Sequence, residues 1–251
     1  MNEVLRVEGL VKRFRGLVAT DQAGLEVRLG ELHALIGPNG AGKSTLVNQL
    51  SGELRPDAGS IVFDGQDITD WPAPRRAQAG LVRSYQITSV FAEFSALENV
   101  MLAVQARRGR HFAAWKNTLR DPELTEPAWE ALALVGLEGQ AHTPAEEMAH
   151  GGRRQLELAM ALALQPRLML LDEPLAGMSQ AESESMTLLL RGLKGRISML
   201  LIEHDMQAVF ALADRVTVLV AGRPVATGTP DEIRGSALVR EAYLGEPEES
   251  L

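Results

Sequence analysis

Eight consecutive residues near the start of the chain have the spacing that wraps a backbone loop around a phosphate group. They read Gly37-Pro38-Asn39-Gly40-Ala41-Gly42-Lys43-Ser44, which matches the whole pattern G-x-x-x-x-G-K-S. Glycines let successive backbone N–H groups turn inward without a side chain in the way. A lysine at this position reaches the β- and γ-phosphates, and the serine hydroxyl binds Mg²⁺. The loop therefore predicts nucleotide binding.

Two acidic residues, Asp172 and Glu173, directly follow the apolar run 168–171. An apolar strand that ends in acids places them at the carboxyl edge of a sheet, where open α/β folds bind ligands. There Asp172 would hold Mg²⁺ through water, and Glu173 would polarise the attacking water. The alternative is a strand that ends at the surface in two solvated acids. The phosphate-binding loop upstream favours the catalytic interpretation.

His204 and Gln86 are further candidates for a role at the phosphates. His204 follows the apolar run Ile197–Ile202, which places it at the same sheet edge as Asp172 and favours a position near the γ-phosphate. A lone histidine is more often structural or simply exposed. Gln86 follows the run Gly80–Tyr85, and its side chain could sense the nucleotide and the metal, although a single glutamine says little by itself.

The pattern of apolar residues predicts the elements that must hold these side chains. Alternation over the first thirty residues indicates half-buried strands, and 95–164 has the spacing of helices. Strands and helices then alternate, which argues for a parallel sheet covered by helices. The predicted strands of that sheet are Leu32–Ile36, Arg167–Leu171, Ile197–Ile202 and Arg215–Val220, with helices at Ser44–Leu50, Ala181–Leu193 and Met206–Ala213, and a strand and tight turn at Ile61–Gly65.

Composition narrows the class of protein. The 251 residues are 45% hydrophobic and 23% charged, as in a soluble globular chain. The absence of cysteine excludes disulfides and thiolate metal sites. A net charge of −8 argues against nucleic acid as a partner. No run approaches the 18 apolar residues of a membrane span, so we expect a cytosolic protein whose membrane role comes through a partner.

Together these motifs resemble the ATP-binding subunits of ATP-binding cassette (ABC) transporters over essentially the whole chain. Four stretches resemble the ATPases of branched-chain amino-acid importers more closely: Gly16–Ala19, the helical segment around Ala106–Trp129, Ile202–Met206 and Ala242–Glu246. The resemblance implies an α/β P-loop ATPase fold with a mainly parallel core sheet, an antiparallel β lobe and an inserted α-helical lobe. It places one ATP-binding domain over residues 1–251, with the helical lobe at roughly 88–164.

The resemblance also implies roles for individual residues. Catalysis would use Glu173, His204 and Gln86, and the metal ligands would be Ser44, Gln86 and Asp172. The residues that would contact ATP are Phe14 (stacked on adenine), Gly37, Pro38, Asn39, Gly40, Ala41, Gly42, Lys43, Ser44, Thr45, Ala149, His150, Gly151 and Gly152.

The last four of these belong to the family's signature, L-S-G-G-Q, which closes over the nucleotide of a second ATPase subunit. Here Ala149 replaces the serine, and Ser179 replaces an aspartate of a later loop. Losing one charge-assisted hydrogen bond costs about 1.5–3 kcal/mol, so a site completed by this signature would be about ten- to a hundredfold slower. We therefore expect two unequal sites if the partner is a different subunit.

The resemblance further implies membrane partners and a place in the cell. Permease subunits would dock near Gln86–Phe94, where Val90, Phe91 and Phe94 form either a socket or ordinary core packing. A periplasmic solute-binding protein would take part indirectly, and the chain would lie on the cytoplasmic face of the inner membrane. Three alternatives stay open: a catalytically weak regulatory subunit, the ATPase of an exporter such as a lipopolysaccharide transporter, and a soluble ABC ATPase of DNA repair or translation.

Overall fold

The computed structural model describes residues 3–84, 90–108 and 121–243, and the chain divides into two compact units. The first unit comprises residues 1–83, 167–173 and 190–251, and the second comprises 84–166 and 174–189. Gln86, with its neighbours 85–89, lies outside the described residues, as do 109–120 and 244–251. Among the described residues, no helix is both long and apolar enough to span a bilayer.

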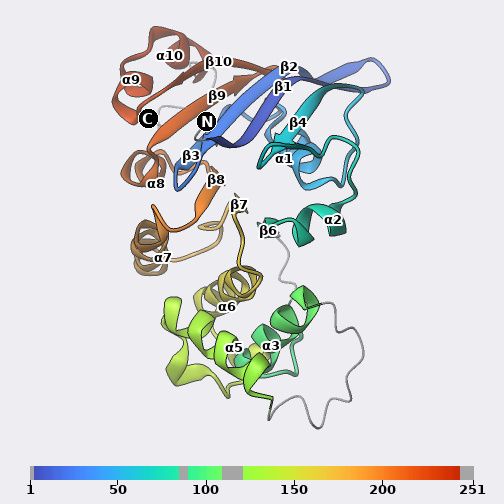
Figure 1. Ribbon diagram of the computed structural model, residues 1–251. Coiled ribbons are helices and arrows are strands. Elements are labelled where there is room, and N and C mark those ends of the chain that lie inside the picture. Colours follow the sequence, from blue (N-terminus) through green and yellow to red (C-terminus); the bar gives the residue numbers. More distant parts are fainter. Residues whose placement is uncertain (1–2, 85–89, 109–120, 244–251) are drawn as a thin grey trace. The chain divides into compact units, whose positions relative to one another are not determined.

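The first unit contains the predicted core sheet, whose six strands lie in the order β10-β9-β3-β8-β7-β6 (Figure 1). Its central strands pair in parallel, with Leu35 opposite Ile202 and Asp172 also opposite Ile202. Every residue of β3, β7 and β8 is buried, as expected of strands covered on both faces. The strands are β3 (Leu32–Ile36), β6 (Leu81–Ser84), β7 (Leu168–Asp172), β8 (Ser198–Ile202), β9 (Arg215–Val220) and β10 (Arg223–Gly228).

A separate antiparallel sheet forms the predicted β lobe, in the order β2-β1-β4-β5. Leu5 of β1 lies between Val27 of β2 and Phe63 of β4, and their side chains join one core with those of the first helix. Asp64 and Gly65 both have positive φ, as a two-residue hairpin turn requires. The strands are β1 (Glu3–Phe14), β2 (Leu17–Arg28), β4 (Ala58–Phe63) and β5 (Gln66–Asp67).

Helices complete the first unit, and several of its elements were not predicted from the sequence. Strand β10 alternates between exposed and half-buried positions, contains Pro224, and has no buried residue, so it lacks an apolar signal. Helices α2, α9 and α10 are each six or seven residues long, too short for a clear helical period. The helices are α1 (Lys43–Ser51), α2 (Ala73–Gln78), α8 (Met206–Leu212), α9 (Pro230–Gly235) and α10 (Ala237–Tyr243).

The second unit is helical, as the spacing predicted. The apolar residues of α3 at 97, 100, 101 and 104 recur at helical spacing and are all buried, and Ser95 and Glu98 close a capping box at its start. Helix α7 begins in this unit and ends in the first. The elements are α3 (Ala96–Arg107), α5 (Pro122–Leu134), η1 (Glu138–Gln140), η2 (Ala145–Glu147), α6 (His150–Ala163) and α7 (Gln180–Leu193).

Candidate functional site

The phosphate-binding loop joins the buried strand β3 to helix α1, as the motif requires. Helix α1 starts at Lys43, and its first turn carries no acidic side chain. No negative side chain of that turn therefore neutralises the positive end of the helix dipole. Asn39 and Gly40 are exposed, and a Cβ built on Gly40 would meet no atom within 4 Å. The outer side of the loop is therefore open to a ligand.

The inner side of the loop is packed against other backbone. Gly42 has φ +99°, and a Cβ there would lie 2.2 Å from the carbonyl oxygen of Ala19 in β2. The Gly222 N–H, in the turn between β9 and β10, donates to the carbonyl of Ala41 at 2.8 Å. A Cβ on Gly37 would collide with the carbonyl of Leu219 in β9. The glycines thus let the loop nest between β2 and the β9–β10 hairpin.

Lys43 is buried and folds back over the loop that precedes it. Its Nζ donates to the carbonyl oxygens of Gly37 and Pro38, at 2.5 and 3.1 Å. Ser44 at the next position is exposed, whereas Thr45 is half-buried. The amine and the hydroxyl thus lie at the helix terminus, where an anion would be bound.

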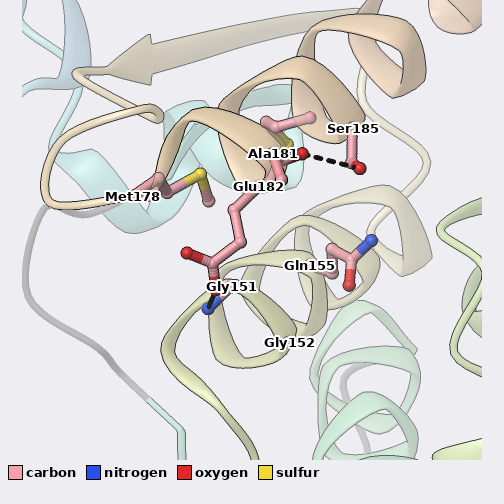
Figure 2. A pocket seen from close by; sticks show the side chains of 8 residues that line it. Gly151, Gly152, Gln155, Met178, Ala181, Glu182 and Ser185 are labelled. Carbon is pink, nitrogen blue, oxygen red and sulfur yellow. Dashed lines mark hydrogen bonds between the residues drawn. The ribbon is translucent and has the colours of Figure 1, made fainter.

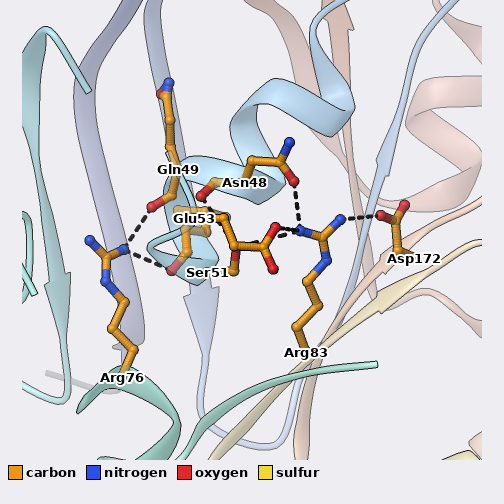
Figure 3. A network of polar contacts seen from close by, with 8 residues as sticks. Asn48, Gln49, Ser51, Glu53, Arg76, Arg83 and Asp172 are labelled. Atoms are coloured by element: carbon orange, nitrogen blue, oxygen red, sulfur yellow. Dashed lines mark hydrogen bonds and ion pairs between the residues drawn. The ribbon is translucent and has the colours of Figure 1, made fainter. Parts of the chain in front are cut away.

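Asp172 ends β7, and its carboxylate is held by a residue that the sequence analysis missed. Arg83 of β6 donates from Nη2 to Asp172 Oδ2 at 2.7 Å, and from Nη1 to Asn48 Oδ1 of α1 at 2.6 Å (Figure 3). A signal for Arg83 was present in the sequence, because it is the one charged residue in the run Gly80–Tyr85. Arginines in apolar strands need a buried partner.

Glu173 and His204 lie together at the end of neighbouring strands. His204 Nε2 is 2.7 Å from Glu173 Oε1, a hydrogen bond that the ring donates when the carboxylate is ionised. Glu173 has φ +50°, a conformation that is uncommon for a residue with a side chain and that often marks functional sites. Its N–H donates to the carbonyl of Ile202 at 2.9 Å, which continues the pairing of β7 with β8 past the strand end.

The two acids beside His204 accept hydrogen bonds from backbone N–H groups of this segment. Glu203 is buried, and its carboxylate accepts from the His204 N–H at 3.1 Å. Asp205 caps α8 by accepting from the backbone N–H groups of Gln207 and Ala208. The sequence therefore has a structural reason to place acids on both sides of this histidine.

The remaining predicted residues of the first unit fit the site in part. Phe14 ends β1 with 46% of its surface exposed, and the ammonium of Lys12 lies 5.9 Å from its ring centroid. Its ring is thus available for stacking. Among the described residues, no three histidine or acidic side chains converge on a metal position. A nucleotide-borne Mg²⁺ suits this arrangement, because it needs only one or two protein ligands besides phosphates.

In the second unit, Ala149 caps α6 without any side-chain hydrogen bond, consistent with the missing hydroxyl. Glu182 of α7 supplies a hydrogen-bond acceptor at this helix start instead, because its Oε1 accepts from the Gly151 N–H at 3.0 Å. Figure 2 shows this contact beside a pocket of about 230 Å³ that Gly152 also lines. Hydrogen bonds from the Ser179 hydroxyl, the Ser179 N–H and the Gly151 N–H hold the pKa of Glu182 below its usual value. His150, which directly follows Ala149, is exposed.

The aromatic segment after Gln86 is only partly core. Phe91 is 56% exposed and stacks on Phe94 with ring centroids 5.5 Å apart, so core packing is wrong for Phe91. Val90 and Phe94 are half-buried. Buried Asn99 fixes the segment, since its side chain bonds the backbone of Phe91 at both N–H and carbonyl. Aromatic side chains, phenylalanine included, are enriched in contact surfaces between proteins.

Comparison with known proteins agrees with these features. The sequence model of the ABC transporter family matches residues 20–176, and that of the branched-chain amino acid ATP-binding cassette transporter matches residues 223–249. The high-affinity branched-chain amino acid transport ATP-binding protein BraF of Pseudomonas aeruginosa is 37% identical, over 97% of this chain and 98% of its own. The lipopolysaccharide export system ATP-binding protein LptB of Acidithiobacillus ferridurans is 34% identical, with 98% of both chains covered.

A solved structure shows the same fold. The ADP conformation of MJ1267, an ATP-binding cassette of an ABC transporter, superposes with a TM-score of 0.85 at 29% identity, over 98% of this chain and all of that one. The predicted α/β fold, with its parallel core sheet and antiparallel lobe, is confirmed. With a phosphate-binding loop, paired acids and a histidine on one sheet edge, and relatives matched over nearly their full length, this chain belongs to the ABC transporter family of ATPases.

Proposed function

We propose that this chain is the ATP-hydrolysing subunit of an importer for branched-chain or other hydrophobic amino acids. The observation that carries hydrolysis is the 2.7 Å contact of Glu173 with His204, in the same compact unit as the phosphate-binding loop. The substrate class rests on BraF and on the family segment at 223–249. In this proposal residues 1–251 form one ATP-binding domain, with a helical lobe at roughly 88–164.

ATP would be held by the loop and by the aromatic side chain of Phe14. The backbone N–H groups of 39–44 and the ammonium of Lys43 would bind the β- and γ-phosphates. Mg²⁺ would be held by the hydroxyl of Ser44, with Gln86 and Asp172 beside it, and would neutralise charge on the same phosphates. Asp172 is buried, and Arg83 donates a hydrogen bond to its Oδ2. This contact supports the proposed role because it fixes the direction of the carboxylate.

Glu173 would act as the base for the attacking water. Its carboxylate accepts a proton as the water oxygen bonds to the γ-phosphorus and the bond from that phosphorus to the β,γ-bridging oxygen breaks. The products are ADP and inorganic phosphate. His204 would hold the Glu173 carboxylate and lie near the γ-phosphate, and Gln86 would report the state of the site to the permeases.

A second ATPase subunit would complete each site with its signature. In this chain the signature residues are 149–152, and Ala149 supplies no hydroxyl. We therefore propose that the site completed by this signature is the slower one in a heterodimer. Glu173→Gln in this chain, and the same change in the partner, measures the two rates separately. Equal residual rates would contradict the asymmetry.

The membrane partners would be permease subunits that dock at residues 86–94, and the exposed ring of Phe91 supports that position. The chain would then lie on the cytoplasmic face of the inner membrane and serve a periplasmic solute-binding protein through the permeases. Nucleic acid is not an expected partner, because the net charge of the chain is −8.

Reconstitution in lipid vesicles tests the function. The chain, its second ATPase subunit, both permeases and the binding protein should release phosphate and accumulate leucine in an ATP-dependent manner. Phosphate release without leucine uptake would contradict the amino-acid assignment and favour an exporter, for which the similarity to LptB is the specific reason. Absence of phosphate release would favour a regulatory subunit, for which Ala149 and Ser179 are the specific reasons.

A further inference from the structure

Arg83 links the Asp172 carboxylate to the helix that follows the phosphate-binding loop. Its Nη2 donates to Asp172 Oδ2 at 2.7 Å, and its Nη1 donates to Asn48 Oδ1 at 2.6 Å and Glu53 Oε2 at 2.7 Å. Figure 3 shows the guanidinium between the end of β7 and the last turns of α1. One side chain thus ties together three segments that are distant in the sequence.

Burial makes this arrangement specific. The side chains of Arg83 and Asp172 are 11% and 8% exposed, so the pair is screened much less than a surface ion pair. A guanidinium is a planar fork whose donors point in fixed directions, and Asn48 and Glu53 set the plane of this fork. Asp172 can therefore rotate little while Arg83 holds one of its oxygens.

We propose that Arg83 is a positioning residue for the metal, one that orients Asp172 toward Mg²⁺ bound with the nucleotide. The inference rests on the metal role proposed above for Asp172. Partners of this kind, which orient a ligand without touching the metal, typically change metal affinity by about 10–100-fold when they are removed.

The positive charge of Arg83 and its orienting effect on Asp172 have opposite effects on Mg²⁺ affinity, so the direction of the change in affinity tells them apart. A guanidinium near the site repels Mg²⁺, so by charge alone its removal would tighten metal binding. If orientation dominates, its removal weakens metal binding. Arg83→Lys retains the charge but not the fork, since an ammonium cannot span Asp172 and Asn48 in the same fixed plane.

The test is a titration of Mn²⁺, a spectroscopic stand-in for Mg²⁺, into the full chain with ADP bound. The paramagnetic signal of free Mn²⁺ gives its affinity for the protein–ADP complex, corrected for Mn²⁺ bound by ADP alone, and no turnover is involved. Arg83→Gln should weaken this affinity by about 10–100-fold, and Arg83→Lys should weaken it less. The affinity for ADP in EDTA, from competition with a fluorescent nucleotide, should change less than about twofold.

Arg76 supplies the matched control because it supports the same helix without reaching Asp172. Its Nη1 donates to the carbonyls of Gln49 and Leu50 at 2.7 and 2.8 Å, also shown in Figure 3. Arg76→Lys should lower the melting temperature and leave the Mn²⁺ affinity unchanged. An equal loss of Mn²⁺ affinity in both arginine variants would mean general damage to α1 and would overturn the inference.

Asp172→Asn provides a second, independent arm. If Arg83 acts through Asp172, adding Arg83→Gln to Asp172→Asn should weaken Mn²⁺ binding by less than about twofold. Tighter or unchanged Mn²⁺ binding in Arg83→Gln refutes the inference alone. A wild-type protein that does not raise Mn²⁺ affinity above that of free ADP refutes the proposed metal role, and this inference with it.

Discussion

His204 Nε2 lies 2.7 Å from Glu173 Oε1, although 31 residues separate them in the chain. The contact follows from the register of β7 with β8, in which Asp172 lies opposite Ile202. Because parallel strands end at a common edge, the residues just beyond them meet there. Because Glu173 has a positive φ, its side chain no longer follows the alternation of side chains between the two faces of the sheet. The pairing of the two side chains therefore follows from the strand register.

Replacing Glu173 by Gln should abolish most turnover and leave ATP binding intact. The amide keeps the size of the side chain but cannot accept the proton of the attacking water, and such losses are about 10²–10⁴-fold. Phosphate release and binding of a fluorescent ATP analogue measure the two properties separately. Glu184→Gln, an exposed position on α7, is the control and should keep full turnover. Retained turnover in Glu173→Gln would remove this residue as the base.

His204→Ala should also slow turnover, and its effect should depend on Glu173. If the ring works by holding the Glu173 carboxylate, the double variant Glu173→Gln with His204→Ala should be no slower than the slower single variant. Single-turnover rates of phosphate release measure all three. Multiplicative losses would indicate instead that the histidine and the glutamate act independently on the phosphate.

Gly42→Ala should destabilise the protein more than Gly40→Ala does. Both glycines have positive φ, so alanine costs about 1–2 kcal/mol of backbone strain at either position. Only at Gly42 would the new Cβ meet backbone, 2.2 Å from the Ala19 carbonyl, which raises the expected loss to about 2–5 kcal/mol. Urea unfolding measures the difference. Equal losses would show that the loop moves away from β2 at little cost.

Glu182→Gln should make the start of α7 less sensitive to acid. The pKa of Glu182 is lowered by hydrogen bonds from Ser179 and Gly151, so the ionised form stabilises the fold. That stabilisation is present above the ordinary glutamate pKa, about 4.3, and is lost as the pH falls through the lower folded-state value. Wild type should therefore melt above Glu182→Gln at pH 7, and the two should converge below about pH 4.

Glu184→Gln on the same helix is the control for this comparison. Glu184 accepts from the Gln180 side chain at 3.1 Å, and its replacement should leave the melting temperature at pH 7 close to that of wild type. A difference between wild type and Glu182→Gln that is constant from pH 7 to pH 3 would contradict the contribution assigned to the ionised carboxylate.

Local patterns in the sequence predict most strands of the first unit and the common sheet edge at which Glu173 and His204 lie. Strand β9 and the buried strand β3 begin and end where predicted, because continuous apolar runs between turn residues have few other interpretations. The conformation of the loop 37–44 could be predicted because its glycines occupy the positions with positive φ. Strand β10 could not be predicted in this way, since it has no buried position and is defined only by pairing with β9.

Contacts between distant segments account for what the sequence did not predict. Arg83 was missed because its partners, Asn48 and Asp172, lie 35 and 89 residues away, and no short motif joins them. Glu182 was missed because it looks like the second half of an ordinary capping box with Ser179. Its contact with the Gly151 N–H depends on the packing of α6 against α7.

The hairpin β9–β10 forms one wall of the phosphate-binding loop, with the Gly222 N–H bonded to the Ala41 carbonyl at 2.8 Å. A fragment ending at residue 176 would contain the full span matched by the ABC transporter model, including every letter of the loop motif. It would nevertheless lack the backbone of the β9–β10 hairpin against which that loop packs. Residues beyond 176 therefore contribute to the surface that holds this loop, and expression trials of shortened chains should extend at least through β10.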